Sequence, residues 1–318
     1  MTPPRYGPLR DPDRGPDLPR PCPDPDPGLA PTLPRSALSG LAGPEYLFGD
    51  SITGLTETAS GVRVDFRHGV PRDFGLVIGA DGLHSHVRRL AFGPEETYVT
   101  HLGHYAATWQ LPNAWGPEGG TVGHTAPGRF ASVGVDGRDP GLARTFCVFA
   151  APELSYDRHD PDQQKRLIAD AFSGLGWEVP RLLASLRQAP ELYFDSISRA
   201  DVPTWSKGRV CLIGDAACGA TIGGMGTGTA MVAAYVLAGE LARARGDHRV
   251  AFARYESRLR KYAEGCQAGG GRTGKFYAPA TSAGIRFRDA LLSRPLFLNA
   301  MLRMGERVST TVELPVYE

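Results

Sequence analysis

The sequence predicts an α/β fold in which an antiparallel sheet is inserted between the two halves of an α/β domain. Two short apolar runs, at 76–78 and 210–213, each lead through a glycine to an acid and then to a segment with helical character. Between them, short runs of apolar and aromatic residues succeed one another, which is typical of strands. The last part of the chain has charged and apolar residues at helical spacing.

The most informative stretch is 208–230, GRVCLIGDAACGATIGGMGTGTA. Its apolar run predicts a short buried strand, Asp215 follows the carboxyl end of that strand, and a glycine-rich turn leads into a helix expected over 229–244. Ligands of open α/β sheets bind outside the carboxyl ends of the strands, and a helix N-terminus offers unpaired N–H groups. Asp215 is therefore placed to accept a hydrogen bond from a ribose hydroxyl. The alternative is a tight strand–helix corner that needs its glycines for packing alone.

A second stretch repeats this arrangement earlier in the chain. Residues 76–78 predict a buried strand that ends at Gly-Ala-Asp-Gly, with Asp81 as its acid. The segment that follows, LHSHVRRLAFG, has helical character, and Ser85 lies near its start. Taken alone, Asp81 and the glycine after it form a common turn.

Together, these stretches resemble a known family, the FAD-dependent aromatic hydroxylases, which are single-component monooxygenases related to p-hydroxybenzoate hydroxylase. The stretch around Asp215 is similar to the family's Gly-Asp motif, and GADGLHSHVRRL is similar to its Asp-Gly motif, Asp-Gly-x-x-Ser-x-Val-Arg. LPRSAL at 33–38 resembles a further element whose arginine contacts the flavin side of the cofactor. The resemblance covers about 33–265, with one departure. Ala220-Thr221-Ile222 stands where the common form has a proline in the turn.

The resemblance implies a Rossmann-like FAD-binding domain and a monooxygenase that hydroxylates an aromatic or polyketide-like small molecule with NAD(P)H and O₂. FAD is the implied cofactor and NAD(P)H a transient co-substrate. The implied cofactor-binding residues are Arg35, Asp81, Gly214, Asp215, Gly224, Met225, Gly226 and Thr227. No side chain is singled out as a catalytic acid or base, because the cofactor supplies the chemistry.

The N-terminal segment departs from this family. Residues 1–34 are largely Pro, Asp, Arg and Gly, and we expect them to be disordered or extended. A Pro-rich ligand for a partner domain is the functional alternative. A complete family member opens with a strand, a Gly-x-Gly-x-x-Gly turn, a helix and a second strand, and no such pattern precedes residue 35. We therefore expect weak or no FAD binding and a tendency to aggregate. The alternative function is a catalytically silent, truncated remnant.

The remaining regions complete the predicted organisation. Residues 35–95 and 200–246 form the incomplete FAD-binding domain, 96–199 a β-sheet domain for the substrate, and 247–318 a C-terminal helical region. In the substrate domain, Asp160 or Asp162 lies near the cap of a predicted helix. The aromatic side chains that could face the substrate there, although core packing is favoured for each, are Tyr105, Trp109, Phe130 and Phe149.

The C-terminal region contains a second glycine pattern, Gly269, Gly271 and Gly274, spaced as Gly-x-Gly-x-x-Gly. A charged helix precedes it where the nucleotide-binding fingerprint requires a strand, so that interpretation is rejected. The segment 284–304 predicts an amphipathic helix that docks on the core in preference to a membrane surface.

Composition excludes several classes of protein. The 318 residues carry a formal net charge of +1, which gives no reason to expect nucleic acid as a partner. No apolar run approaches the roughly 20 residues of a membrane helix. The five cysteines show no paired spacing and the histidines no metal-ligand spacing, so we expect reduced thiols, no metal and a cytoplasmic location. The oligomeric state does not follow from these features.

Overall fold

The computed structural model describes residues 45–114, 120–220, 226–295, 297 and 314–317. The chain divides into two compact units, Met1–Gly49 and Asp50–Glu318, and every helix and strand below belongs to the second. The Pro-rich segment 1–34 lies outside the described residues, and so does Arg35.

Two small sheets form the α/β part of the chain, and the second of them carries both motif strands. An antiparallel sheet has the order β1-β2-β3, formed by β1 (Ile52–Glu57), β2 (Val62–Phe66) and β3 (Arg72–Phe74). Val62 and Val64 point into the core as their alternation predicts. The second sheet has the order β10-β11-β4, formed by β10 (Ser206–Lys207), β11 (Val210–Leu212) and β4 (Val77–Gly79).

In the second sheet, β11 lies parallel to β4, with Val210 opposite Val77 and Leu212 opposite Gly79. The two strands that lead to Asp81 and Asp215 are therefore neighbours, and their carboxyl ends meet at the same edge of the sheet. Gly79 leaves no room for a side chain, since a Cβ there would lie 2.7 Å from Leu212 and 2.9 Å from Val87. The prediction of two α/β halves that come together around an inserted region is confirmed.

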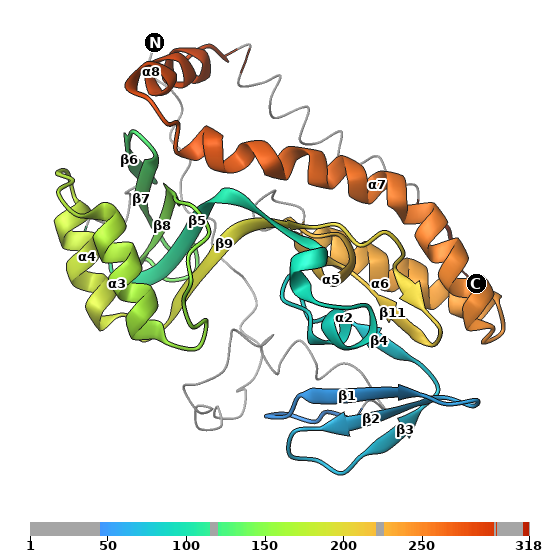
Figure 1. The fold of residues 1–318 in the computed structure, drawn as a ribbon. Helices are drawn as coiled ribbons and strands as arrows, with labels where there is room; N and C mark the ends of the chain where they lie inside the picture. The colour runs from blue at the N-terminus through green and yellow to red at the C-terminus, as the bar shows by residue number, and fades with distance from the viewer. Residues whose placement is uncertain (1–44, 115–119, 221–225, 296, 298–313, 318) are drawn as a thin grey trace, which may run out of the picture. The chain divides into compact units, whose positions relative to one another are not determined.

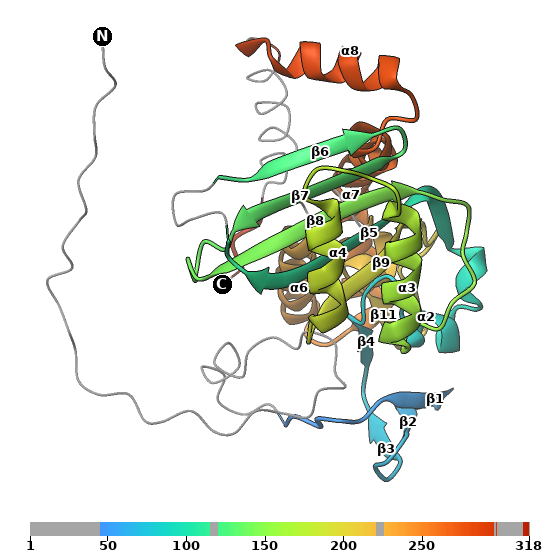
Figure 2. The ribbon, with the colours of Figure 1, turned by 90° about the vertical axis from the view of Figure 1, so that its left-hand side faces the viewer.

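The inserted region forms a five-stranded antiparallel sheet (Figure 2). Its strands, in spatial order, are β6 (Val122–Ala126), β7 (Arg129–Val135), β8 (Leu142–Ala150), β5 (Val99–Pro112) and β9 (Leu192–Ala200). Two helices, α3 (Pro161–Phe172) and α4 (Val179–Gln188), cover one face and close a hydrophobic core with it. Asp160 is the cap of α3, because its carboxylate accepts a 2.9 Å hydrogen bond from the Gln163 amide.

Short helices follow each motif strand. They are α2 (His86–Ala91), the 3₁₀ helix η1 (Glu95–Thr97), α5 (Asp215–Cys218) and α6 (Gly226–Arg243). The helix expected over 229–244 thus begins three residues earlier, within the glycine-rich turn. A second core lies among these helices, the two small sheets and the first half of the next helix, α7 (His248–Tyr277).

Helix α7 (His248–Tyr277) has 30 residues and contacts both halves of the molecule (Figure 1). It packs on α5 and α6 and also on β5, β8 and β9. The Gly-x-Gly-x-x-Gly segment lies inside this helix, which agrees with the rejection of a nucleotide-binding turn there. Gly274 faces His104 of β5, where a Cβ would lie 2.6 Å from the imidazole Cγ.

Two helices differ in how far the sequence predicted them. Helix α4 was not predicted, although Val179, Leu182 and Leu186 carry the helical spacing and are buried. Pro180 lies in the first turn of α4, where a proline is tolerated. Helix α8 (Ser282–Leu292) overlaps the predicted amphipathic segment; it buries none of its residues, but Arg288 donates a 3.0 Å hydrogen bond to Thr125 of β6. Part of the predicted segment, 296 and 298–304, lies outside the described residues, so its docking on the core stays a prediction.

The described cysteines and helices bear on two further expectations, which are reduced thiols and no membrane helix. Cys147, Cys211, Cys218 and Cys266 are free thiols. Burial raises the pKa of Cys218 to about 12, which agrees with a buried filler in preference to a reactive thiol. Among the described helices, none is long and apolar enough to span a bilayer.

Candidate functional site

The two acids of the predicted motifs lie just beyond the carboxyl ends of β4 and β11. The backbone carries the pairing one residue past the strands, where the Ile213 amide donates a 2.9 Å hydrogen bond to the Gly79 carbonyl. Crevices at this end of parallel strands are where α/β sheets bind ligands. Asp81 and Asp215 therefore occupy the position that the sequence predicted, but their surroundings differ.

The carboxylate of Asp81 is engaged within its own loop. One oxygen accepts a hydrogen bond from the hydroxyl of Ser85, and the other accepts a 3.0 Å bond from the Val87 amide. Ser85 is the cap of α2 and accepts a 2.9 Å bond from the Arg88 amide. Asp81 thus shapes the turn between β4 and α2.

The carboxylate of Asp215 has no such partners. Asp215 is the first residue of α5, and Gly214 before it turns the chain with φ +59°, a conformation that favours glycine. In the described part of the chain, no donor reaches this carboxylate, and burial alone raises its pKa above the ordinary value. A half-buried carboxylate without a donor is the group that a ligand hydroxyl would satisfy.

The glycines around Asp215 divide into two kinds. A Cβ on Gly219 would lie 2.6 Å from the Asp215 Cα, so this glycine serves packing. A Cβ on Gly226 would reach only ordinary contact, 3.6 Å from the Asp215 carboxylate, so this glycine leaves the acid uncovered. A small cavity of about 20 Å³ lies here, lined by Asp215, Cys218, Ala220, Gly226, Thr229, Cys266 and Gln267.

The other predicted cofactor-binding residues lie either close to Asp215 or outside the described residues. Thr227 is exposed in the first turn of α6, next to Gly226. Gly224 and Met225 lie outside the described residues, as does Arg35. The structure therefore brings Gly214, Asp215, Gly226 and Thr227 together around one strand–helix corner, with Asp81 on the neighbouring strand.

Arg88 joins the two turns and was not predicted as a site residue. It is fully buried, and its guanidinium donates a 3.0 Å hydrogen bond to the Ala216 carbonyl and another to the Leu83 carbonyl. A further contact, 3.8 Å long, reaches Glu95. The signal was present in the sequence, because Arg88 is the last residue of Asp-Gly-x-x-Ser-x-Val-Arg.

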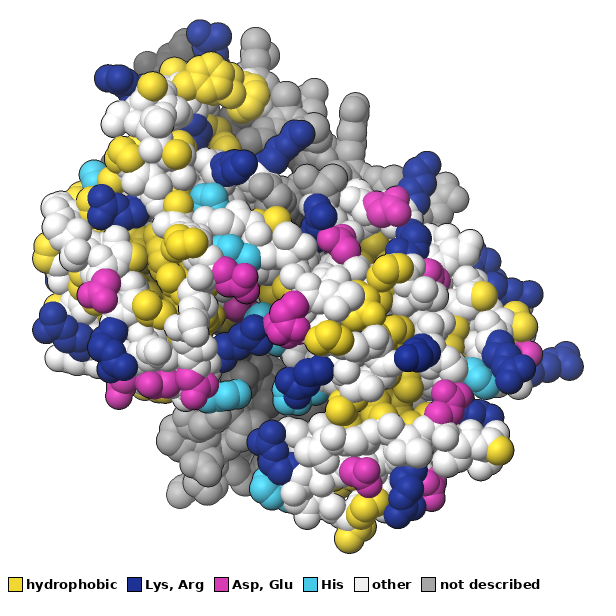
Figure 3. Space-filling view, viewed as in Figure 1, with side chains coloured by type: hydrophobic (Ala, Val, Ile, Leu, Met, Phe, Trp, Pro, Cys, Tyr) yellow, Lys and Arg dark blue, Asp and Glu magenta, His cyan; other side chains and the backbone are white. Residues whose placement is uncertain are grey.

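An ionic cluster also lies between this loop and the five-stranded sheet. His84 contacts Glu95 of η1 through Nδ1 at 2.9 Å and Asp195 of β9 through Nε2 at 2.9 Å. Arg158 lies 2.7 Å from Glu95. Acidic, basic and histidine side chains gather on the face where α2 meets the sheet (Figure 3). The four residues are spread over more than a hundred positions, so no local pattern could reveal the cluster.

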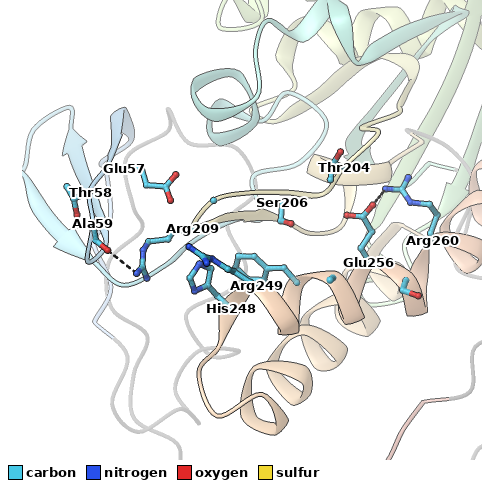
Figure 4. Close-up of a pocket in the computed structure, with 14 residues that line it drawn as sticks. Glu57, Thr58, Ala59, Thr204, Ser206, Arg209, His248, Arg249, Glu256 and Arg260 are labelled. Carbon is cyan, nitrogen blue, oxygen red and sulfur yellow. Dashed lines mark hydrogen bonds and ion pairs between the residues drawn. The ribbon is translucent and has the colours of Figure 1, made fainter.

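A larger hollow lies elsewhere. A pocket of about 770 Å³ opens beside the N-terminal end of β11 and the first turns of α7 (Figure 4). Several of its charged side chains already have partners within the chain. Arg260 pairs with Glu256, and Arg209 donates to the Gly75 and Ala59 carbonyls. Since the acids of the motifs follow the opposite end of β11, this pocket is separate from the candidate site.

The aromatic candidates for substrate contact belong mainly to the core. Tyr105, Trp109 and Phe149 are at most 3% exposed and pack against α3 and α4. Phe130 is half-buried and contacts Phe146 and Tyr277. In the described part of the chain, no group of His, Cys, Asp and Glu could hold a metal ion.

Comparison with known proteins identifies the family. The FAD binding domain family matches residues 41–268. A flavin-dependent monooxygenase of Legionella longbeachae is 32% identical over 272 residues, which cover 85% of this chain and 68% of that protein. An uncharacterized protein of Mycobacterium tuberculosis is 41% identical over 221 residues, 69% of this chain. The chain spans 59% of that relative's length.

Solved structures agree with the fold. The crystal structure of tetracycline destructase Tet(55) matches with a TM-score of 0.70 and 31% identity, covering 84% of this chain and 69% of that one. Klebsiella pneumoniae HpxO, solved with FAD and uric acid, matches with a TM-score of 0.63 and 21% identity, covering 82% of this chain and 66% of that one. The second likeness concerns the fold alone.

Proposed function

We propose an FAD-dependent oxygenation for this chain, because the chain belongs to the FAD binding domain family of flavin-dependent monooxygenases. We further propose that NAD(P)H is the reductant and that the substrate is an aromatic or polyketide-like small molecule. When bound, the flavin supplies the chemistry with O₂, and the protein supplies binding, orientation and exclusion of water. Tetracycline destructases, named among the similar structures, have a polycyclic substrate in their name, which supports this class of substrate.

The observation that carries the proposal is the carboxylate of Asp215. It lies half-buried beyond the carboxyl end of β11, its pKa is raised by burial, and it lacks a donor from the described residues. We propose that a ribityl or ribose hydroxyl of FAD donates to it. Gly226 would keep its oxygens accessible, and the first amides of α6 would face the flavin.

Asp81 would act differently in this proposal. Because its oxygens are occupied by Ser85 and Val87, it would set the conformation of the turn after β4 and orient the first turn of α2. Arg88 would hold that turn at a fixed distance from α5. The two motifs would then act as one support for the cofactor.

A specific observation favours the alternative, a remnant that binds FAD weakly or not at all. Among the described strands, β4 has a neighbour on one edge only. On α6, Met231 and Tyr235 are exposed at 68% and 45%. Uncovered apolar surface and an open strand edge close to the acid-bearing turns favour self-association over a rigid site.

Titration with FAD, followed by flavin fluorescence, tests both functions. The proposal expects saturable binding, and Asp215→Ala should weaken it by roughly 1–3 kcal/mol, the usual cost of a charged hydrogen bond. Asp201→Ala, which removes an exposed acid of a surface ion pair with Arg199, is the control and should leave the affinity unchanged. Absence of binding by the unchanged chain would establish the alternative. Equal affinity in the Asp215 variant would remove Asp215 from the site.

A further inference from the structure

We propose that His84 is a positioning residue of the flavin site, which as an imidazolium ties the Asp81 turn to strand β9 of the substrate-binding sheet. The positioning role rests on the proposed function. The tie itself, which consists of the contacts of His84 with Asp195 and Glu95, is a property of the chain alone. Nothing in the family resemblance assigns a role to His84.

The geometry places His84 between two elements from opposite halves of the molecule. Its residue lies in the loop between Asp81 and the cap of α2. Its Nε2 lies 2.9 Å and 3.0 Å from the two oxygens of Asp195, in the middle of β9. Its Nδ1 lies 2.9 Å from Glu95 Oε1. The three side chains are largely buried, with 23%, 16% and 23% of their surface exposed.

The chemistry of the partners defines the charge of the ring. An ionised carboxylate only accepts hydrogen bonds, whereas a neutral imidazole has one N–H and one bare nitrogen. Both ring nitrogens of His84 can bond ionised carboxylates only when both carry a proton. Hydrogen bonds to Asp195 and Glu95 outweigh the opposing effect of burial and raise the pKa of His84 above 6.5.

The other charged groups around the ring reinforce the two carboxylates. Arg158, from the loop before α3, binds Glu95, and the buried guanidinium of Arg88 on α2 lies 3.8 Å from the same carboxyl group. Burial alone would raise the pKa of Glu95, but the bonds from His84 and Arg158 hold it at about 2. Tyr156 is close enough to Asp195 for the acid to contribute to the raised pKa of its phenol.

The pH range of the tie follows from these directions. A histidine with a raised pKa stabilises the folded state fully below its unfolded value, near 6.5, and this stabilisation is lost as the pH rises through the folded pKa. Glu95 contributes above its unfolded value of 4.5 and would be lost only as the pH falls toward 2. The tie is therefore intact at mildly acidic pH and is lost as the pH rises through the folded pKa of His84.

The test begins with the chain without flavin. The pKa of His84 is measured by NMR on the protein with ¹³C-labelled histidine, and the assignment comes from His84→Gln. Urea unfolding at pH 6 and pH 9 is then compared for His84→Gln, Asp195→Asn, the double variant and His159→Gln, an exposed histidine on a neighbouring loop. At pH 6, the urea midpoint of the double variant should fall no further than that of the less stable single variant. At pH 9, the urea midpoints of the single variants should approach that of wild type.

A flavin measurement separates positioning from stability. Between pH 6 and pH 9, the FAD affinity of wild type should fall several-fold more than that of His84→Gln. The affinity of His159→Gln should follow that of wild type. A His84 pKa at or below 6.5, or additive losses in the two single variants, would overturn the tie. An intact tie with a pH-independent FAD affinity would overturn the positioning role. Absence of FAD binding at every pH, with the tie measured as described, would contradict the proposed function and leave the tie established.

Discussion

The buried guanidinium of Arg88 donates a 3.0 Å hydrogen bond to the backbone carbonyl of Ala216, so one side chain joins the turn after β4 to the helix after β11. Ala216 is the residue next to Asp215, and Arg88 lies in the helix that Asp81 orients. The relation between the two acids therefore depends on a contact between residues that are distant in sequence.

Removal of this contact should destabilise the fold. In Arg88→Met, the Ala216 and Leu83 carbonyls would lose charged donors in a buried place, and we expect a loss of about 3 kcal/mol in the free energy of unfolding. Arg89→Met, at the exposed neighbouring position, should change it by about 0.5 kcal/mol or less. Urea unfolding of both variants measures the difference. Similar midpoints for the two would show that Arg88 is not a structural link.

The ionisation of Asp215 should cost stability when no ligand is bound. Burial raises its pKa, so the folded chain holds this proton more tightly than the unfolded chain does. Stability from this group is present at low pH and falls as the pH rises from the unfolded value, 3.8, through the raised folded value. Asp215→Asn should therefore stabilise the ligand-free protein at pH 7 by about 0.5–2 kcal/mol. Thermal unfolding across pH 4–8 checks this, and a destabilised Asn variant would contradict it.

Much of the local structure follows from sequence patterns, because short-range chemistry determines it. Alternation at Val62 and Val64, the cap at Asp160 and the glycine–acid corners at Asp81 and Asp215 all need only neighbouring residues. Helix α4 was not predicted, although the spacing of its buried residues Val179, Leu182 and Leu186 is local as well.

The contacts that organise the candidate site could not be predicted in the same way. Arg88 meets Ala216, and His84 meets Asp195, only because β4 and β11 pair in parallel and β9 crosses nearby. Sequence distance hides such pairs, and a charged residue such as Glu95, whose side chain is 23% exposed, is usually expected at the surface. That no described residue donates to Asp215 likewise depends on what the fold places around it.

Gly226 should be replaceable without loss of fold but with loss of cofactor. An added methyl would contact the Asp215 carboxylate at 3.6 Å, and alanine favours a helix over glycine by about 0.5–1 kcal/mol. Gly226→Ala should therefore fold at least as well as wild type and bind FAD several-fold more weakly. Gly228→Ala, in the same turn of α6 with open space around its Cβ, should gain the same stability and keep its affinity. If both variants bound FAD with equal affinity, these glycines would serve packing alone.

Two glycines of α7 should respond in opposite ways to the same substitution. Gly265→Ala adds a methyl in open space and should stabilise the protein by about 0.5–1 kcal/mol. Gly274→Ala places a methyl 2.6 Å from His104 Cγ, near the fixed base of that side chain, and should cost about 1–3 kcal/mol. Thermal unfolding measures both. Stabilisation by both substitutions would mean that α7 does not press on β5.

Helix α7 also has a mechanical consequence. Its 30 residues extend over about 45 Å, and it is clamped to α6 at one end and to the five-stranded sheet at the other. Because α7 packs on both halves, a movement of the sheet away from Asp215 must either bend α7 or break its packing at one end. Glycine offers the least resistance to bending in a helix. We therefore expect the glycines within α7 to take up such bending.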